Sequence, residues 1–91
     1  MISRVELARG FAVPSHHHAN EQFAVVLSGR VRFGLGVEGS SAHRYEVADG
    51  GSIVVLPANV PHSAEALEDS VILDIFSPPS ATTGVDASVR G

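Results

Sequence analysis

The chain contains no cysteine and no lysine among its 91 residues. The absence of cysteine excludes disulfide bonds, thiolate metal sites and cysteine nucleophiles. The absence of lysine excludes Schiff-base chemistry and the phosphate-binding loop that depends on a lysine. Any chemistry of this protein therefore depends on histidine, carboxylate and hydroxyl groups.

Basic charge and long apolar runs are also scarce. All six basic residues are arginines, they are scattered singly, and the formal net charge is −4. No basic stripe can follow a phosphate backbone, so nucleic acid is not an expected partner. The longest apolar runs, at 23–27 and 53–58, are far shorter than the roughly 18 residues of a membrane-spanning helix, so no membrane partner is expected. Residues 1–8 carry Arg4 and Glu6 where a signal peptide needs an uninterrupted apolar stretch, which favours a cytoplasmic protein.

Apolar residues recur in this sequence with a period of two. Short β-branched runs are bounded by glycine or proline, and no window repeats at helical spacing. A chain of this size can form a single core, so we predict one small all-β domain, a sandwich or barrel, over residues 1–76. Residues 77–91 contain two prolines and no periodicity and are expected to form a flexible tail. The expected strands are 3–7, 11–13, 21–27, 30–37, 44–47, 52–56, 62–66 and 70–76.

The expected strand at 30–37 carries apolar side chains at every second position. Val31, Phe33, Leu35 and Val37 would share one face of that strand. We therefore expect all four in the core of the domain.

Four of the five histidines form two groups, each beside a turn at the end of an expected strand. In an extended chain, side chains two residues apart share a face. His16, His18 and Gln22 would therefore point to one side, whereas His17 and Glu21 would point to the other. Imidazole nitrogens suit Zn, Cu, Ni, Fe and Mn ions, and an amide oxygen is a weaker, neutral ligand.

A further ligand must come from another part of the chain. His62 is the candidate, because it follows the proline-bounded bend at 57–61, a rigid element that can direct a side chain back toward the first group. A β-bulge that shifts the register by one residue would bring Glu21 to the metal in place of Gln22. The sequence thus predicts a site for one divalent metal ion, with either of these residues beside the histidines.

Two motifs in the chain resemble those of the cupins, a family of small β-barrels of the jelly-roll type. The first cupin motif has the pattern G-x5-H-x-H-x3,4-E-x6-G, and the second has the pattern G-x5-P-x-G-x2-H-x3-N. In this chain glutamine takes the glutamate position of the first motif, asparagine the glycine position of the second, and alanine its last position. The matching residues are Gly10, His16, His18, Gln22 and Gly29 in the first motif and Gly51, Pro57, Asn59, His62 and Ala66 in the second.

The resemblance implies that His16, His18, Gln22 and His62 bind one divalent transition metal (Zn, Mn, Fe, Ni or Cu) inside the mouth of the barrel. The usual glutamate ligand would contribute a negative charge, which the amide of Gln22 does not. The charge of the ion would then be less compensated by its ligands, and we expect weaker binding.

Only nine residues precede the first motif, so the resemblance implies a jelly-roll barrel that is short at its N-terminus. Such a barrel leaves a strand edge open, and open edges are usually paired or covered. We therefore expect a homodimer that shares strands across its interface. Phe23, Val25 and Leu27, on the face opposite Gln22, provide an apolar strip for this contact.

The strings HHHANEQ, LPANVPHSAEAL and LEDSVILDIFSPP are similar to those of small cupins related to a pectin-degradation protein that linearises 4,5-unsaturated uronates to open keto sugars. In those proteins an Asp-x-Phe pair on the last strand, and an arginine that follows it, contribute to the active site. The pair corresponds to Asp74 and Phe76, which the resemblance implies are catalytic, whereas the arginine position holds Ser80. A lone aspartate among apolar residues is costly to bury, and near a metal Asp74 could act as a general base or proton shuttle.

Three functions agree with these residues. The first is a metal-dependent isomerase or lyase that acts on a small sugar acid such as an unsaturated uronate, with Asp74 moving a proton. The second is a non-haem metal dioxygenase, since a three-histidine set leaves positions open for substrate and oxygen. The third is a non-catalytic barrel that binds a sugar or another small ligand. The cupin fold hosts many chemistries, so the fold alone does not choose among them.

Overall fold

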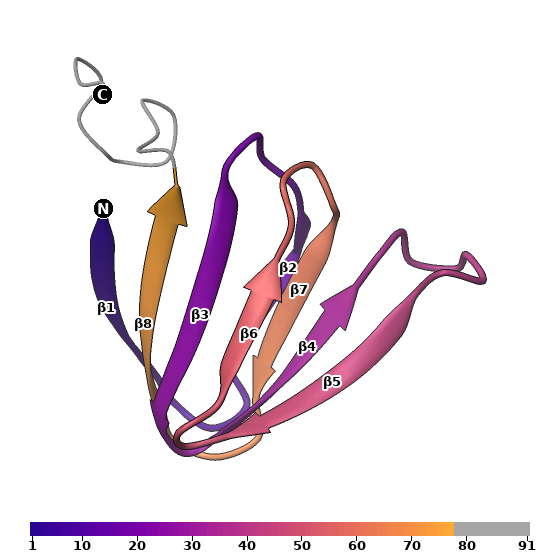
Figure 1. Ribbon diagram of the computed structural model, residues 1–91. Helices are drawn as coiled ribbons and strands as arrows, with labels where there is room; N and C mark the ends of the chain where they lie inside the picture. Colours follow the sequence, from indigo (N-terminus) through magenta and orange to yellow (C-terminus); the bar gives the residue numbers. More distant parts are fainter. Residues whose placement is uncertain (78–91) are drawn as a thin grey trace.

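The computed structural model describes residues 1–77, and these form eight strands and no helix. The all-β prediction is confirmed: the strands build two antiparallel sheets, in the orders β1-β8-β3-β6 and β2-β7-β4-β5 (Figure 1). Within the described part of the chain there is no helix that could cross a membrane. The tail expected at 77–91 lies, apart from its first residue, outside the described residues. The bounds are β1 Ile2–Leu7, β2 Ala12–His16, β3 Glu21–Ser28, β4 Arg30–Leu35, β5 Arg44–Asp49, β6 Ile53–Leu56, β7 His62–Ala66 and β8 Ser70–Ser77.

All eight expected strands are present, with differences at their ends. β2 runs beyond its expected end to His16, and it tolerates Pro14 because an edge strand can lack one amide donor. β4 ends at Leu35 rather than at residue 37. The expectation that Val37 lies in the core is wrong, because the chain turns at Gly36, where φ is +96°, and leaves Val37 58% exposed.

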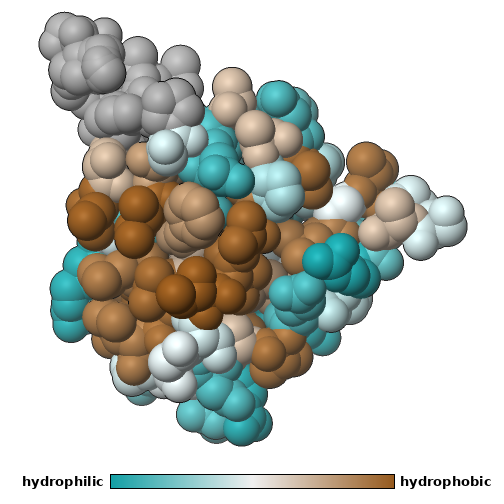
Figure 2. Space-filling model, in the orientation of Figure 1, coloured by the Kyte–Doolittle hydropathy of each residue, from teal (hydrophilic) through white to brown (hydrophobic). Residues whose placement is uncertain are grey.

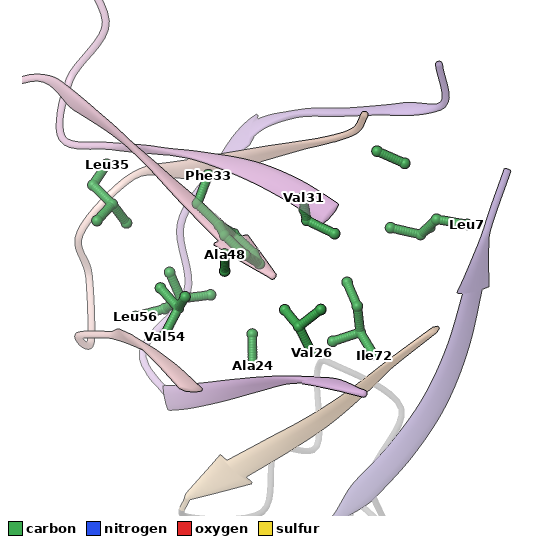
Figure 3. Packing of buried hydrophobic residues seen from close by; sticks show 11 residues of the cluster. Leu7, Ala24, Val26, Val31, Phe33, Leu35, Ala48, Val54, Leu56 and Ile72 are labelled. Carbon is green, nitrogen blue, oxygen red and sulfur yellow. The ribbon is translucent and has the colours of Figure 1, made fainter. Parts of the chain in front are cut away.

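The core lies between the two sheets, where side chains from their inner faces meet (Figure 3). Val31 and Phe33 on β4 face Val26 on β3 and Leu56 on β6 across this space. Removing a buried side chain of this size typically costs about 2–5 kcal/mol of unfolding free energy, so the core holds the inner faces firmly in place. The buried apolar residues are Leu7, Ala24, Val26, Val31, Phe33, Leu35, Ala48, Val54, Leu56, Ala66 and Ile72.

The two loops that adjoin the cupin-type histidines meet at one end of the sandwich, the upper end in Figure 1. One loop joins β2 to β3, and the other joins β6 to β7. The backbone amide of Asn59 in the second loop donates a hydrogen bond of 2.8 Å to the carbonyl of His18 in the first. Asn59 has a φ of +63°, a left-handed conformation that asparagine adopts more readily than most residues. Asparagine can therefore stand where the motif usually has glycine.

The sheet β1-β8-β3-β6 is apolar on both of its faces. Its inner face contributes to the core, and its outer face forms the broad hydrophobic area in Figure 2. Ile2 and Ile53 on this outer face are 65% and 64% exposed. The apolar strip expected on β3 therefore extends across the neighbouring strands. We call this surface the outer apolar face; its residues are Ile2, Phe23, Val25, Leu27, Ile53, Val55, Val71, Leu73 and Ile75.

Candidate metal centre

Three histidines come together where the two loops meet. His16 ends β2, His18 follows it in the loop, and His62 begins β7. Each ring offers one nitrogen, and the three nitrogens lie within 4.8 Å of one another. Two nitrogens bound to one ion at about 2.1 Å can be at most about 4.2 Å apart, so a small movement of the side chains would bring all three to a single ion.

The other nitrogen of each ring is held by a backbone carbonyl two residues away. A carbonyl oxygen can only accept a hydrogen bond, so Nδ1 of each neutral ring carries the proton and Nε2 carries the lone pair. Histidines that bind metals usually donate their second nitrogen in this way, which fixes both the tautomer and the ring orientation. The distances are 3.0 Å from His16 to Pro14, 3.1 Å from His18 to Asn20 and 3.1 Å from His62 to Val60.

His62 shows most clearly that the site suits a cation. The residue is 5% exposed, and its buried Nε2 has no hydrogen-bond partner among residues 1–77. Leaving such an atom unsatisfied costs about 1–3 kcal/mol. Burial lowers the pKa of His62, the hydrogen bond to Val60 opposes this, and the nearby imidazoles of His16 and His18 lower the pKa further. The ring is thus kept neutral, with a free lone pair that a metal ion would satisfy.

Gln22, near the start of β3, places an oxygen beside these nitrogens. The residue is 8% exposed, and its Oε1 lies 3.2 Å from Nε2 of His18. Because Nδ1 of His18 donates to Asn20, both facing atoms carry lone pairs when the ring is neutral. A cation bound to both atoms would satisfy the two lone pairs. The donor set of three imidazoles and one amide oxygen therefore fits a divalent transition metal.

The two residues implied to be catalytic lie on β8, beside the histidines and Gln22. Oδ1 of Asp74 accepts a hydrogen bond of 2.7 Å from Nε2 of Gln22. Burial raises the pKa of Asp74 above its ordinary value, and the hydrogen bond from Gln22 opposes that rise. The ring of Phe76 stands edge-on to that of His18, with centroids 5.7 Å apart.

Three other residues considered from the sequence do not join this group. His17 and Glu21 are exposed and lie outside the lining of the cavity described below. Ser80 lies outside the described residues. His18 lies close to His16 and His62 although the chain around it is not extended throughout, because β2 ends at His16 and β3 begins only at Glu21.

The histidines line a cavity of about 300 Å³. Core side chains such as Phe33, Leu56 and Ile72 form its apolar walls. Within residues 1–77 no arginine lines it, and four arginines pair with carboxylates elsewhere. The size suits a small molecule, since ligand pockets start at about 300 Å³. The polar side chains of the lining are His16, His18, Gln22, His62, Ser63 and Asp74.

Sequence reasoning missed several polar contributors to the site. Ser63 lines the cavity, although strict alternation along β7 would turn it away from His62. The carbonyls of Pro14, Asn20 and Val60 orient the histidine rings. Every residue has a carbonyl, so no residue type could have identified these three in advance.

The sequence matches the family model of the cupin domain over residues 3–76. KdgF from Halomonas sp. is similar in structure, with a TM-score of 0.76 and 32% identity, over 88% of this chain and 70% of that one. No curated protein matches the sequence at a significant level.

Two further structures share the fold at lower identity. A conserved protein of unknown function from Streptococcus pyogenes has a TM-score of 0.76 and 22% identity, over 87% of this chain and 64% of that one. The Drosophila melanogaster CENP-C cupin domain has a TM-score of 0.75 and 14% identity, over 85% and 56%. The chain thus spans less than two thirds of the length of these two proteins. The predicted jelly-roll fold is confirmed.

Proposed function

This chain belongs to the cupin family, and on that basis we propose that it binds one divalent transition-metal ion and isomerises a small unsaturated sugar acid. The ligands are His16, His18, His62 and Gln22. The observation that carries the proposal is the buried, unpartnered Nε2 of His62, which faces the two other histidines. The similarity to KdgF at 32% identity, and the sequence resemblance to cupins that linearise unsaturated uronates, support the choice of substrate.

The proposed reaction opens the ring of a 4,5-unsaturated uronate. The anomeric hydroxyl loses its proton, the C1–O5 bond breaks as C1 becomes an aldehyde, and C4 gains a proton as C5 becomes a ketone. The product has the same atoms as the substrate, so no co-reactant is needed. A bound divalent ion would supply Lewis-acid polarisation of a substrate oxygen.

Asp74 is the group proposed to move the proton. It lines the cavity, and its Oδ1 is engaged by Gln22 while its other oxygen is left for substrate. Burial raises the pKa of Asp74, which makes it better able to return a proton than an exposed aspartate. Phe76 provides an apolar wall beside His18.

The test is a spectroscopic assay with purified protein, a 4,5-unsaturated monouronate and, in separate reactions, Zn²⁺, Mn²⁺, Fe²⁺, Ni²⁺ and Cu²⁺. The conjugated double bond absorbs ultraviolet light, so ring opening lowers the absorbance. NMR of the product should show an aldehyde hydrate and a new CH₂ group. Asp74→Asn, assayed at a metal concentration high enough to load it, should lose the activity. Unchanged absorbance with every metal, in protein shown to be loaded, would refute the reaction.

A non-catalytic binding function is the second candidate, and the composition of the cavity favours it. Within residues 1–77 no arginine lines the cavity, so no guanidinium is placed there to pair with a uronate carboxylate. A neutral sugar or another uncharged small molecule would not need one. Calorimetry separates the two functions: binding heat with persistent ultraviolet absorbance indicates a binding protein, and loss of absorbance indicates the enzyme.

We further propose that a second copy of this chain covers the outer apolar face. Two of the charged residues at its border, Arg4 and Glu6, pair with each other at 2.6 Å, and a third, Glu21, is exposed at the start of β3. In a symmetric dimer the same face meets itself, and an apolar surface with its charges at the border matches itself.

A further inference from the structure

Gln22 and Asp74 are joined although they lie far apart in sequence. Both sit on the inner face of the sheet, where Gln22 pairs with Phe76 and Ala24 pairs with Asp74 across β3 and β8. Gln22 and Asp74 are thus diagonal neighbours, a separation that a long side chain can span. The small side chain of Ala24 leaves room for the contact, and the two polar groups meet at 2.7 Å.

The hydrogen bond determines which end of the Gln22 amide faces the histidines. A carboxylate can only accept hydrogen bonds. Asp74 therefore holds the NH₂ group of Gln22, and the amide oxygen is left facing His18 at 3.2 Å. Without Asp74 the amide could rotate and present its NH₂ group to the histidines, and an NH₂ group repels a cation.

The charge of Asp74 has no basic partner in the described chain. No arginine within residues 1–77 forms an ion pair with it, and it is the only carboxylate among the cavity-lining residues of that range. The three histidines and the amide are neutral when they act as ligands. A divalent ion in this site would therefore find its nearest negative charge at Asp74, one hydrogen bond beyond Gln22.

We propose that Asp74 is a positioning residue for the metal, which orients the oxygen of Gln22 toward the ion and supplies through it the negative charge that a glutamate ligand would supply directly. Gln22 and Asp74 together then do the work of the single glutamate of the cupin motif. This role rests on the metal binding proposed above, but it does not depend on the reaction or on the substrate.

The experiment measures the affinity of the metal-free 91-residue protein for Co²⁺, by calorimetry and by the visible spectrum of the bound ion. Removing a group that orients a metal ligand typically weakens binding about 10- to 100-fold, which is the loss expected for Asp74→Asn. Glu6→Gln is the matched control, because it removes one negative charge from the exposed side of β1. We expect it to bind Co²⁺ as the wild type does.

The double variant Gln22→Glu with Asp74→Asn tests the mechanism further. It exchanges the two groups, so that a carboxylate faces the ion and an amide NH₂ donates to it from behind. We expect affinity to return to within about threefold of the wild type, a recovery that a purely structural role for Asp74 would not produce. The Co²⁺ spectrum should change in Asp74→Asn and return toward the wild-type form in the double variant.

The outcomes separate this role from the metal proposal itself. If the wild type takes up no Co²⁺, the metal site is refuted and the role of Asp74 with it. If the wild type binds Co²⁺ and Asp74→Asn binds it equally well, the role of Asp74 alone is refuted. A double variant that binds no better than Asp74→Asn would also refute the shared role.

Discussion

Replacing Gln22 by glutamate would place two carboxylates in contact. The nitrogen that now donates to Asp74 would become an oxygen at a starting distance of 2.7 Å. Two unit charges at that distance repel by about 6 kcal/mol at an effective dielectric constant of about 20. The protein can limit this cost by protonating one of the two carboxyl groups. For an ordinary glutamate, whose pKa is about 4.3, protonation costs about 3.7 kcal/mol at pH 7 and about 1 kcal/mol at pH 5.

We therefore expect metal-free Gln22→Glu to lose about 3–4 kcal/mol of unfolding free energy at pH 7 and about 1 kcal/mol at pH 5. This is a large share of the roughly 5–15 kcal/mol typical of a domain. The assay is urea unfolding followed by circular dichroism, with a chelator present at both pH values. Adding Asp74→Asn to the same chain should restore most of the loss. Equal stability of Gln22→Glu and the wild type at pH 7 would show that the two side chains do not share this contact.

Three further predictions concern other parts of the molecule. His62→Ala and His16→Ala should each abolish Co²⁺ binding, because each removes one nitrogen of the cluster. Elemental analysis after gel filtration measures the bound metal, and full occupancy in both variants would rule out the ligand assignment. Asp74→Asn should be more stable than the wild type at pH 7 in the absence of metal. Burial raises the pKa of Asp74 in the folded state, so the charged form of Asp74 opposes folding at neutral pH. The higher unfolding free energy of the variant, measured by urea unfolding, should therefore disappear as the pH falls toward 4. Ile53→Glu on the outer apolar face should shift the protein to monomer in sedimentation velocity, whereas Val47→Glu, a comparably exposed position on the other sheet, should not. A wild type that is already monomeric at high concentration would contradict the proposed dimer.

The strands could be predicted because alternation and turn residues are local signals. The approach of His62 to the first histidines was also predictable, since two ordered motifs identify it. The end of β4 could not be predicted, because Val37 continues the alternation of apolar residues while Gly36 turns the chain away from the strand. Whether a glycine continues a strand or ends it depends on the tertiary contacts around it.

The contact between Gln22 and Asp74 could not be predicted from the sequence. It depends on the pairing of β3 with β8 and on a register that sets the two residues diagonally. The sequence does show that glutamine replaces a glutamate, and it shows a lone aspartate among apolar neighbours. Only the fold shows that Gln22 and Asp74 lie side by side, so that the charge of Asp74 can replace the charge that Gln22 lacks.

The hydrogen bond from Asn59 to His18 has a consequence for how quickly and how tightly a ligand can be captured. It ties the loop before His62 to the loop that holds His18, so neither histidine can swing away without breaking it. Ordering each residue of a free loop costs about 1–2 kcal/mol in conformational entropy. Here that cost is incurred when the chain folds. An arriving ion therefore meets a preorganised pair of loops, and association should be limited by diffusion and dehydration of the ion rather than by rearrangement of the protein.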